Sequence, residues 1–138
     1  MKVYKFGGAS VRNADGVRNL AHIVEGEDSL FIIVSAMGKT TNALERVFGY
    51  MQKGEKEQAN EEIKQIQAYH AEIIDELWGE HTDINEVTLL FGQLRNIVND
   101  IVYRSSDAEL WYDTIVAFGE LISTTIISKY LNHIGTRN

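Results

Sequence analysis

The order of two short apolar segments and the glycines that follow them constrains the fold of this chain more than any other feature. Residues 3–6 read as a short strand that leads directly into Gly7 and Gly8. The run Leu30–Val34 is apolar throughout, and the glycine-containing loop 35–39 follows it. Each loop precedes a segment with helical periodicity, and this alternation indicates an α/β fold with a parallel sheet. The continuous apolar run predicts a strand that is buried on both faces.

The first two helices are predicted by apolar residues that recur at helical spacing. Asn13 or Asp15 can cap the first of them, and Gly26 closes it. The apolar positions of the two helices are Val17, Leu20, Ala21 and Val24, and then Leu44, Val47, Phe48 and Met51.

The middle of the chain, residues 55–105, is predicted to be helical, apart from a break at residues 79–85. Apolar residues spaced three and four apart on both sides of the break predict two amphipathic helices that pack as an antiparallel hairpin. His70 falls on the apolar seam of the first of these helices, which favours a hydrogen-bonded histidine in the core or at an interface. A third long helix is predicted from about Asp107 to Leu131, with Asp107 as its cap.

Composition limits the classes of function. The chain has 138 residues, 13 Lys and Arg against 20 Asp and Glu, and a formal net charge of −7. This acidic balance argues against nucleic-acid binding, which needs a basic surface for the phosphates. Cysteine and proline are both absent, which excludes a disulfide framework and favours long helices. We see no targeting segment and no apolar run of about 20 residues, so we expect a cytoplasmic protein without a membrane partner.

Lys5 stands at the carboxyl end of the first predicted strand, beside Gly7 and Gly8. Ligands of open α/β sheets bind beyond the carboxyl ends of the strands. Glycine amides can approach an anion closely, and a lysine supplies positive charge for a transferring phosphoryl group. The motif Lys-Phe-Gly-Gly-Ala-Ser therefore suggests phosphate binding. An edge-strand lysine followed by a tight turn remains the alternative.

The loop after the second strand opens a helix and is rich in hydroxyl groups. Its Gly-Lys-Thr sequence is like the end of a P-loop, but that motif needs a glycine where Ile33 stands, so we reject a standard P-loop. The residues suited to a polar substrate are Ser35, Thr40, Thr41 and Asn42. The alternative is that Thr40 or Thr41 only caps the helix.

Glu120 is a carboxylate within an apolar stretch of the last predicted helix. Its helical neighbours Ala117, Ser123 and Thr124 form a small polar patch. The preceding Gly119 costs the helix about 1 kcal/mol relative to alanine, which indicates the close approach of another segment. A carboxylate in such a place needs a partner, either a ligand ammonium group or a lysine or arginine of the protein.

Taken together and in order, these segments resemble the aspartokinases, the aspartate-specific branch of the amino acid kinase family. The family begins with a Lys-Phe-Gly-Gly-Thr-Ser-type motif, matched by residues 5–10. Its second strand leads into a Val-Ser-Ala…Gly…Thr-Asn-type motif, matched by residues 34–42, and a later helix carries a Gly-Glu pair, matched by Gly119 and Glu120. The resemblance implies part of an αβα sandwich with a parallel-sheet core, helix-rich in the middle of the chain.

The resemblance also implies transfer of the γ-phosphoryl group of MgATP to the side-chain carboxylate of L-aspartate. The product is 4-phospho-L-aspartate, in the first step of lysine, threonine and methionine biosynthesis. Lys5 would be the catalytic residue that neutralises the transferring group, and no residue is expected to ligate a metal. The residues expected to bind the ATP phosphates are Lys5, Gly7, Gly8 and Ser10, and those expected to bind aspartate are Ser35, Thr41 and Glu120. No general base is required, because a carboxylate is already a nucleophile.

The chain departs from the family pattern in two ways. Ala9 stands where the family usually has threonine, which deletes a hydroxyl near the phosphates. Family members are also several-fold longer. Residues 1–138 are therefore expected to be the N-terminal, substrate-side part of the kinase domain, inactive alone, without the nucleotide-base half or the regulatory ACT region. The full-length protein is expected to be a homo-oligomer. Two alternatives stay open, namely another amino acid kinase with a different carboxylate or phosphate substrate, and a non-catalytic helical interaction domain.

Overall fold

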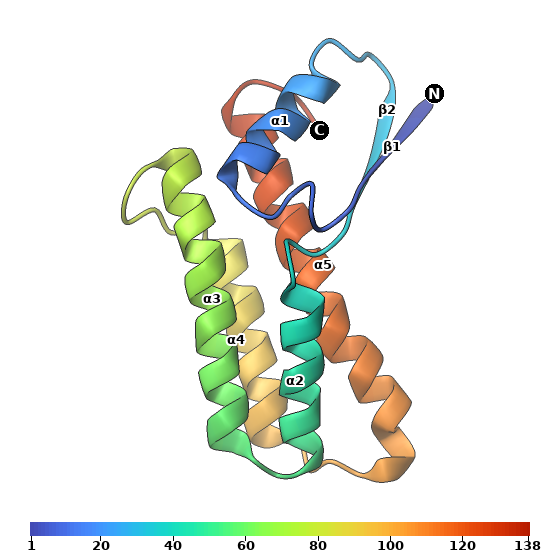
Figure 1. Ribbon diagram of the computed structural model, residues 1–138, viewed down its shortest axis with the longest axis vertical. Helices are drawn as coiled ribbons and strands as arrows, with labels where there is room; N and C mark the ends of the chain where they lie inside the picture. Colours follow the sequence, from blue (N-terminus) through green and yellow to red (C-terminus); the bar gives the residue numbers. More distant parts are fainter.

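The computed structural model describes residues 1–138 and contains one pair of strands and five α-helices (Figure 1). In chain order the elements are β1 (Lys2–Phe6), α1 (Ala14–Val24), β2 (Leu30–Val34), α2 (Thr40–Gln52), α3 (Lys56–Trp78), α4 (Asn85–Asp100), the short 3-10 helix η1 (Ser105–Asp107) and α5 (Ala108–His133). Figure 1 shows the strands and α1 at one end of the molecule and the long helices extending to the other. The chain is thus an α/β fold with a helix-rich middle, as predicted.

β1 and β2 lie side by side as parallel strands, and α1 forms the connection between them (Figure 1). Val3 is paired with Phe31, and Lys5 with Ile33. These four residues share one face, because successive side chains of a strand point to opposite sides. Val3, Phe31 and Ile33 are 59%, 56% and 42% exposed. The prediction that Leu30–Val34 is buried on both faces is therefore wrong, because the core covers only the opposite face of this two-stranded sheet.

The apolar positions predicted for the first two helices are all buried. Asn13 is the cap of α1, and its side-chain oxygen accepts a hydrogen bond from the amide of Gly16 at 2.9 Å. Helical periodicity therefore identified the sides of α1 and α2 that face the core.

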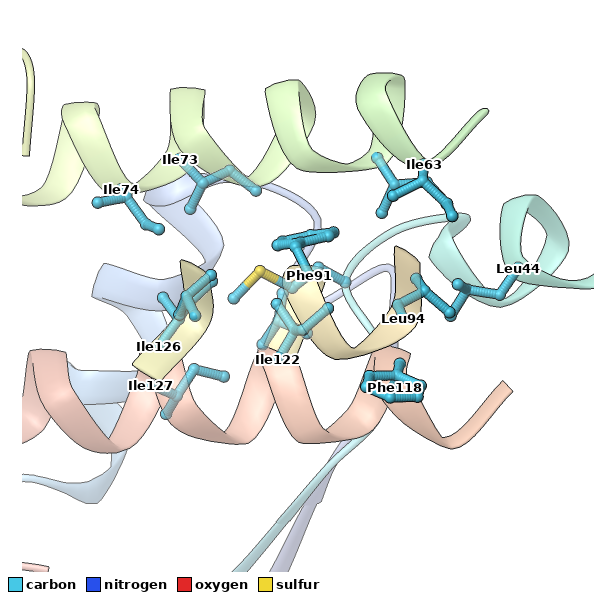
Figure 2. Close-up of a cluster of buried hydrophobic side chains, with 14 of the residues drawn as sticks. Leu44, Ile63, Ile73, Ile74, Phe91, Leu94, Phe118, Ile122, Ile126 and Ile127 are labelled. Atoms are coloured by element: carbon cyan, nitrogen blue, oxygen red, sulfur yellow. The ribbon is translucent and has the colours of Figure 1, made fainter. Parts of the chain in front are cut away.

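The long helices α2, α3, α4 and α5 pack around one core (Figures 1 and 2). α3 and α4 form the predicted antiparallel hairpin (Figure 1). The helical prediction extends too far at its end, because α4 stops at Asp100 and residues 101–104 are not helical. Figure 2 shows the centre of this core, made of Leu44 from α2, Ile63, Ile73 and Ile74 from α3, Phe91 and Leu94 from α4, and Phe118, Ile122, Ile126 and Ile127 from α5.

α5 carries apolar residues around most of its circumference. By length and composition alone, the segment Ser105–His133 is sufficient to cross a membrane, with a mean hydropathy of 1.2 over 18 residues. The prediction that the chain contains no segment long and apolar enough to cross a membrane is therefore wrong for this helix, by length and composition. In the structure one side of α5 packs against α2, α4 and β2, while Leu110 and Leu121 are exposed. A helix at the centre of a protein core has the same composition as a membrane span.

His70 is fully buried in the core and packs against the ring of Phe91. Its Nδ1 donates a hydrogen bond to the carbonyl oxygen of Ile66 at 2.8 Å, and its Nε2 has no partner. The interpretation of His70 as a hydrogen-bonded core histidine is confirmed. Burial lowers the pKa of His70 below the ordinary value of 6.5, because desolvation disfavours the charged ring.

The free energy of unfolding is expected to fall as the pH decreases from about 6.5 toward the lower pKa of folded His70, because the unfolded chain binds a proton there that the folded chain does not. Urea unfolding between about pH 7.5 and pH 5 measures this loss. The variant His70→Leu cannot titrate and should lose that part of the pH dependence. His22→Gln alters an exposed histidine and should keep it. An unchanged pH slope in His70→Leu would contradict the prediction.

Candidate functional site

The two glycine loops lie against each other at the carboxyl ends of β1 and β2. The amide of Gly38 donates to the carbonyl oxygen of Gly8 at 2.9 Å, and the amide of Ser35 donates to that of Phe6 at 3.0 Å. A Cβ added to Gly8 would lie 2.7 Å from the Gly38 carbonyl oxygen and 2.8 Å from that of Ala36. Only glycine permits this approach, which brings the first two predicted motifs into one place.

α5 docks against the second of these loops. A Cβ added to Gly119 would lie 2.8 Å from the Cβ of Ala36. The hydroxyl of Ser123 donates to the carbonyl oxygen of Ser35 at 2.8 Å. The prediction that Gly119 permits close approach of another segment is therefore confirmed. Glu120 follows Gly119 directly in α5, one position on from the docking contact, and is exposed.

Several backbone amides at this junction have no acceptor within the protein. They belong to residues 7, 8 and 9, and to Thr41 and Asn42 in the first turn of α2. Successive free amides in a glycine-containing turn can hold an anion, and the first turn of a helix adds positive potential. The junction therefore has the donors that a phosphate or a carboxylate requires.

The side chains predicted to contact ligands are free of other bonds. Lys5 and Ser10 are exposed, and neither side chain forms a hydrogen bond or an ion pair with the protein. The hydroxyls of Ser35 and Thr41 also have no protein partner. Thr40 differs, because it is buried and its hydroxyl donates to a carbonyl oxygen of the preceding turn at 2.6 Å. Neither threonine caps α2, because its N-cap is Lys39 and no side chain bonds to its first amides. The hydroxyl of Thr40 is used within the turn, and the hydroxyl of Thr41 is free.

Glu120 is exposed and forms no ion pair or hydrogen bond within the protein. Of the two partners considered for it, the lysine or arginine of the protein is therefore not used. Lys5 does not pair with Glu120 and lies on the uncovered face of the sheet. The glycine loops thus present unneutralised donors, and α5 presents one free carboxylate next to its docking residue. Such a pair of groups suits a ligand with both an anionic and a cationic group.

Tyr69 of α3 supports this junction, although the sequence does not single it out. Its hydroxyl donates to the carbonyl oxygen of Arg12. The hydroxyl oxygen of Tyr69 would lie 2.5 Å from a Cβ on Gly38, whose φ is +57°. Burial raises the pKa of Tyr69 above its usual 10.0, which keeps the hydroxyl protonated as a donor. The sequence shows only that Tyr69 is next to His70 on the apolar side of a helix. That position predicts that the Tyr69 ring packs in the core, and it does not predict a contact with a loop.

The chain matches the family model described as Amino acid kinase family over residues 1–137. Aspartokinase 1, chloroplastic, of Arabidopsis thaliana is 32% identical over 145 residues, which cover 98% of this chain and 24% of that protein. The aspartokinase of Chlamydia trachomatis is 30% identical over 128 residues, which cover 93% of this chain and 27% of that protein. The chain therefore spans about a quarter of the length of the curated relatives that it matches.

Solved structures share this fold. E. coli aspartokinase III, in complex with aspartate and ADP, has a TM-score of 0.78 at 24% identity, over 97% of this chain and 29% of that chain. Clostridium acetobutylicum aspartate kinase has a TM-score of 0.75 at 22% identity, over 96% of this chain and 29% of that chain. The arrangement of two parallel strands and five helices is thus the one found in aspartokinase structures.

Proposed function

The chain belongs to the amino acid kinase family, and from this premise we propose that the protein is an aspartokinase. It would transfer the γ-phosphoryl group of MgATP to the side-chain carboxylate of L-aspartate and form 4-phospho-L-aspartate, the first step of lysine, threonine and methionine biosynthesis. The observation that carries the proposal is the junction of the two glycine loops with α5: the loops present free amides, and the unpaired Glu120 follows the docking residue Gly119. A cytoplasmic location and a homo-oligomeric state remain predictions.

The similar proteins support the choice of substrate. The curated relatives named above are aspartokinases, and the E. coli structure holds aspartate and ADP. Aspartate has two carboxylates and one ammonium group, so it needs both anion donors and a carboxylate for recognition. In this proposal Ser35 and Thr41 contact aspartate, and Glu120 binds its ammonium group.

The phosphate side of the reaction falls to the first glycine loop. The amides of Gly7 and Gly8 and the hydroxyl of Ser10 bind phosphate oxygens of ATP, and Lys5 neutralises the charge on the transferring group. These residues fit such a ligand, because the amides lack acceptors and the lysine lacks an ion pair. Mg²⁺ would arrive bound to the ATP phosphates and shield their charge.

The chemical step needs no proton transfer from the nucleophile. A side-chain carboxylate oxygen of aspartate attacks the γ-phosphorus, and the new O–P bond forms as the bond to the β-phosphate oxygen breaks. ADP leaves with that electron pair. Catalysis therefore rests on positioning the two anionic reactants and on compensating their charge.

Measurement of ADP release by the complete protein with MgATP tests the proposal. Release is expected with L-aspartate and not with L-glutamate. A normal rate with glutamate and none with aspartate would instead assign the protein to another branch of the family. If a folded complete protein released no ADP with either L-aspartate or L-glutamate, the non-catalytic interpretation would be favoured.

The variant Glu120→Gln is expected to raise the KM for aspartate about tenfold or more, because it removes a charge-assisted bond to the ammonium group. The KM for ATP should stay near its original value. The folded state should also keep its stability, since Glu120 is exposed and unpaired. Glu109→Gln, on the first turn of the same helix, is the matched control and should leave both KM values unchanged. An unaltered aspartate KM in Glu120→Gln would remove Glu120 from the site.

A further inference from the structure

A cavity of about 480 Å³ lies between α2, α3 and the loop that precedes α1. Figure 1 shows α2 and α3 side by side, with that loop above the beginning of α2 and beside the upper part of α3. The cavity adjoins the turn at Gly38 on the side of α3. None of the residues assigned to the proposed kinase site lines it. Its volume is within the range of about 300 to 1,000 Å³ that is usual for small-molecule sites.

The charge of the cavity is opposite to that of the whole chain. Arg12, Lys39 and Arg46 line it, and Glu62 is the one acidic residue there. Nε of Arg46 lies 2.5 Å from a carboxylate oxygen of Glu62, so these two charges compensate each other. Arg12 and Lys39 form no ion pair. In a chain of net charge −7, the cavity therefore has two positive charges without a partner.

The remaining wall of the cavity is partly apolar and well held. Ala43 and Ile66 contribute aliphatic surface, and Tyr69 contributes its ring. Because the Tyr69 hydroxyl is bonded to the carbonyl oxygen of Arg12, the ring is fixed beside the arginine. An aromatic or aliphatic group could pack on this wall while its charged end reaches the two free cations.

We propose that this cavity binds a small aromatic phosphate monoester, a dianion with an aromatic body. Arg12 and Lys39 pair with the two negative charges, and the ring of Tyr69 packs against the body. The site does not depend on kinase activity. It shares the turn at Gly38 with the kinase site, so a bound dianion would contact the loop that also touches Gly8.

Titration of the ¹⁵N-labelled complete protein with phenyl phosphate tests the proposal by amide chemical shifts. Shifts are expected at Gly38, Lys39 and Tyr69. Phenol, which lacks the charge, and inorganic phosphate, which lacks the ring, should both bind more weakly. Shifts confined to residues 7–9 would assign the phosphate to the kinase site and overturn the proposal.

Variants that change one charge each distinguish a loss of binding from a loss of folded structure. Arg12→Gln and Lys39→Gln should each raise the dissociation constant about tenfold or more. Lys64→Gln, which alters an exposed residue of α3 outside the cavity, should leave it unchanged. Glu62→Gln frees the charge of Arg46 and should tighten binding, a gain that loss of structure cannot produce. Equal affinity in all four variants would refute the site.

Discussion

Replacing Lys5 with alanine is expected to lower the kcat of the complete kinase about 100- to 1000-fold, the usual cost of removing one group that stabilises a charged transition state. The lysine is exposed and unpaired in the structure, so its loss should not disturb folding. The effect should fall on kcat more than on KM, because the charge to be neutralised develops on the transferring phosphoryl group. ADP release at saturating aspartate and MgATP measures it.

A second lysine on the same strand provides the control. Lys2 is also exposed, and its Nζ lies 3.2 Å from the carboxylate of Glu27. Exposed ion pairs of this kind contribute little to stability, so Lys2→Ala should leave kcat unchanged. If Lys5→Ala raised only the KM for ATP and kept kcat, Lys5 would bind the nucleotide without acting in the transfer.

Replacing Gly119 with alanine is expected to destabilise the chain by about 1–3 kcal/mol, the cost of overpacking a tight contact. The added methyl would lie 2.8 Å from the Cβ of Ala36 and 3.2 Å from a methyl of Leu44. Neither neighbour can turn away, since both are buried. α5 would have to move from the loop, and the KM for aspartate should rise because Glu120 moves with it.

Gly92 of α4 provides a control with the opposite sign. A Cβ added there meets no atom within 4 Å. Gly92→Ala should therefore raise stability by up to about 1 kcal/mol, the difference in helix propensity between the two residues. Urea unfolding of both variants at one pH measures the two changes. If Gly119→Ala were as stable as Gly92→Ala, the close docking of α5 would be wrong.

The helices and strands could be predicted because their signals are local. Apolar spacing located the buried sides of α1 and α2, and the glycines marked the loops. The exposed outer face of β2 could not be predicted, because its burial depends on what lies across the sheet and not on the strand. The end of α4 was also missed. Ile101 packs against the core from an extended backbone, so the apolar pattern continues where the helix does not.

The candidate site also has features that could be predicted from the sequence and features that could not. Its loops and the Gly119-Glu120 pair are short motifs that the sequence displays directly. The distinction between Thr40, whose hydroxyl is bonded internally, and Thr41, whose hydroxyl is free, needs the geometry of the turn. The contact of Tyr69 with Arg12 joins segments 57 positions apart. A single sequence contains no signal for such a contact.

The two-stranded sheet has a consequence for how this chain behaves at high concentration. Each strand has a neighbour on one side only, so the other side presents unpaired backbone donors and acceptors. Val3, Phe31 and Ile33 add apolar surface on the uncovered face. An open strand edge next to exposed apolar residues is a template for pairing with another strand. Wherever this sheet is left uncovered, we expect edge-to-edge self-association to limit the solubility of the chain.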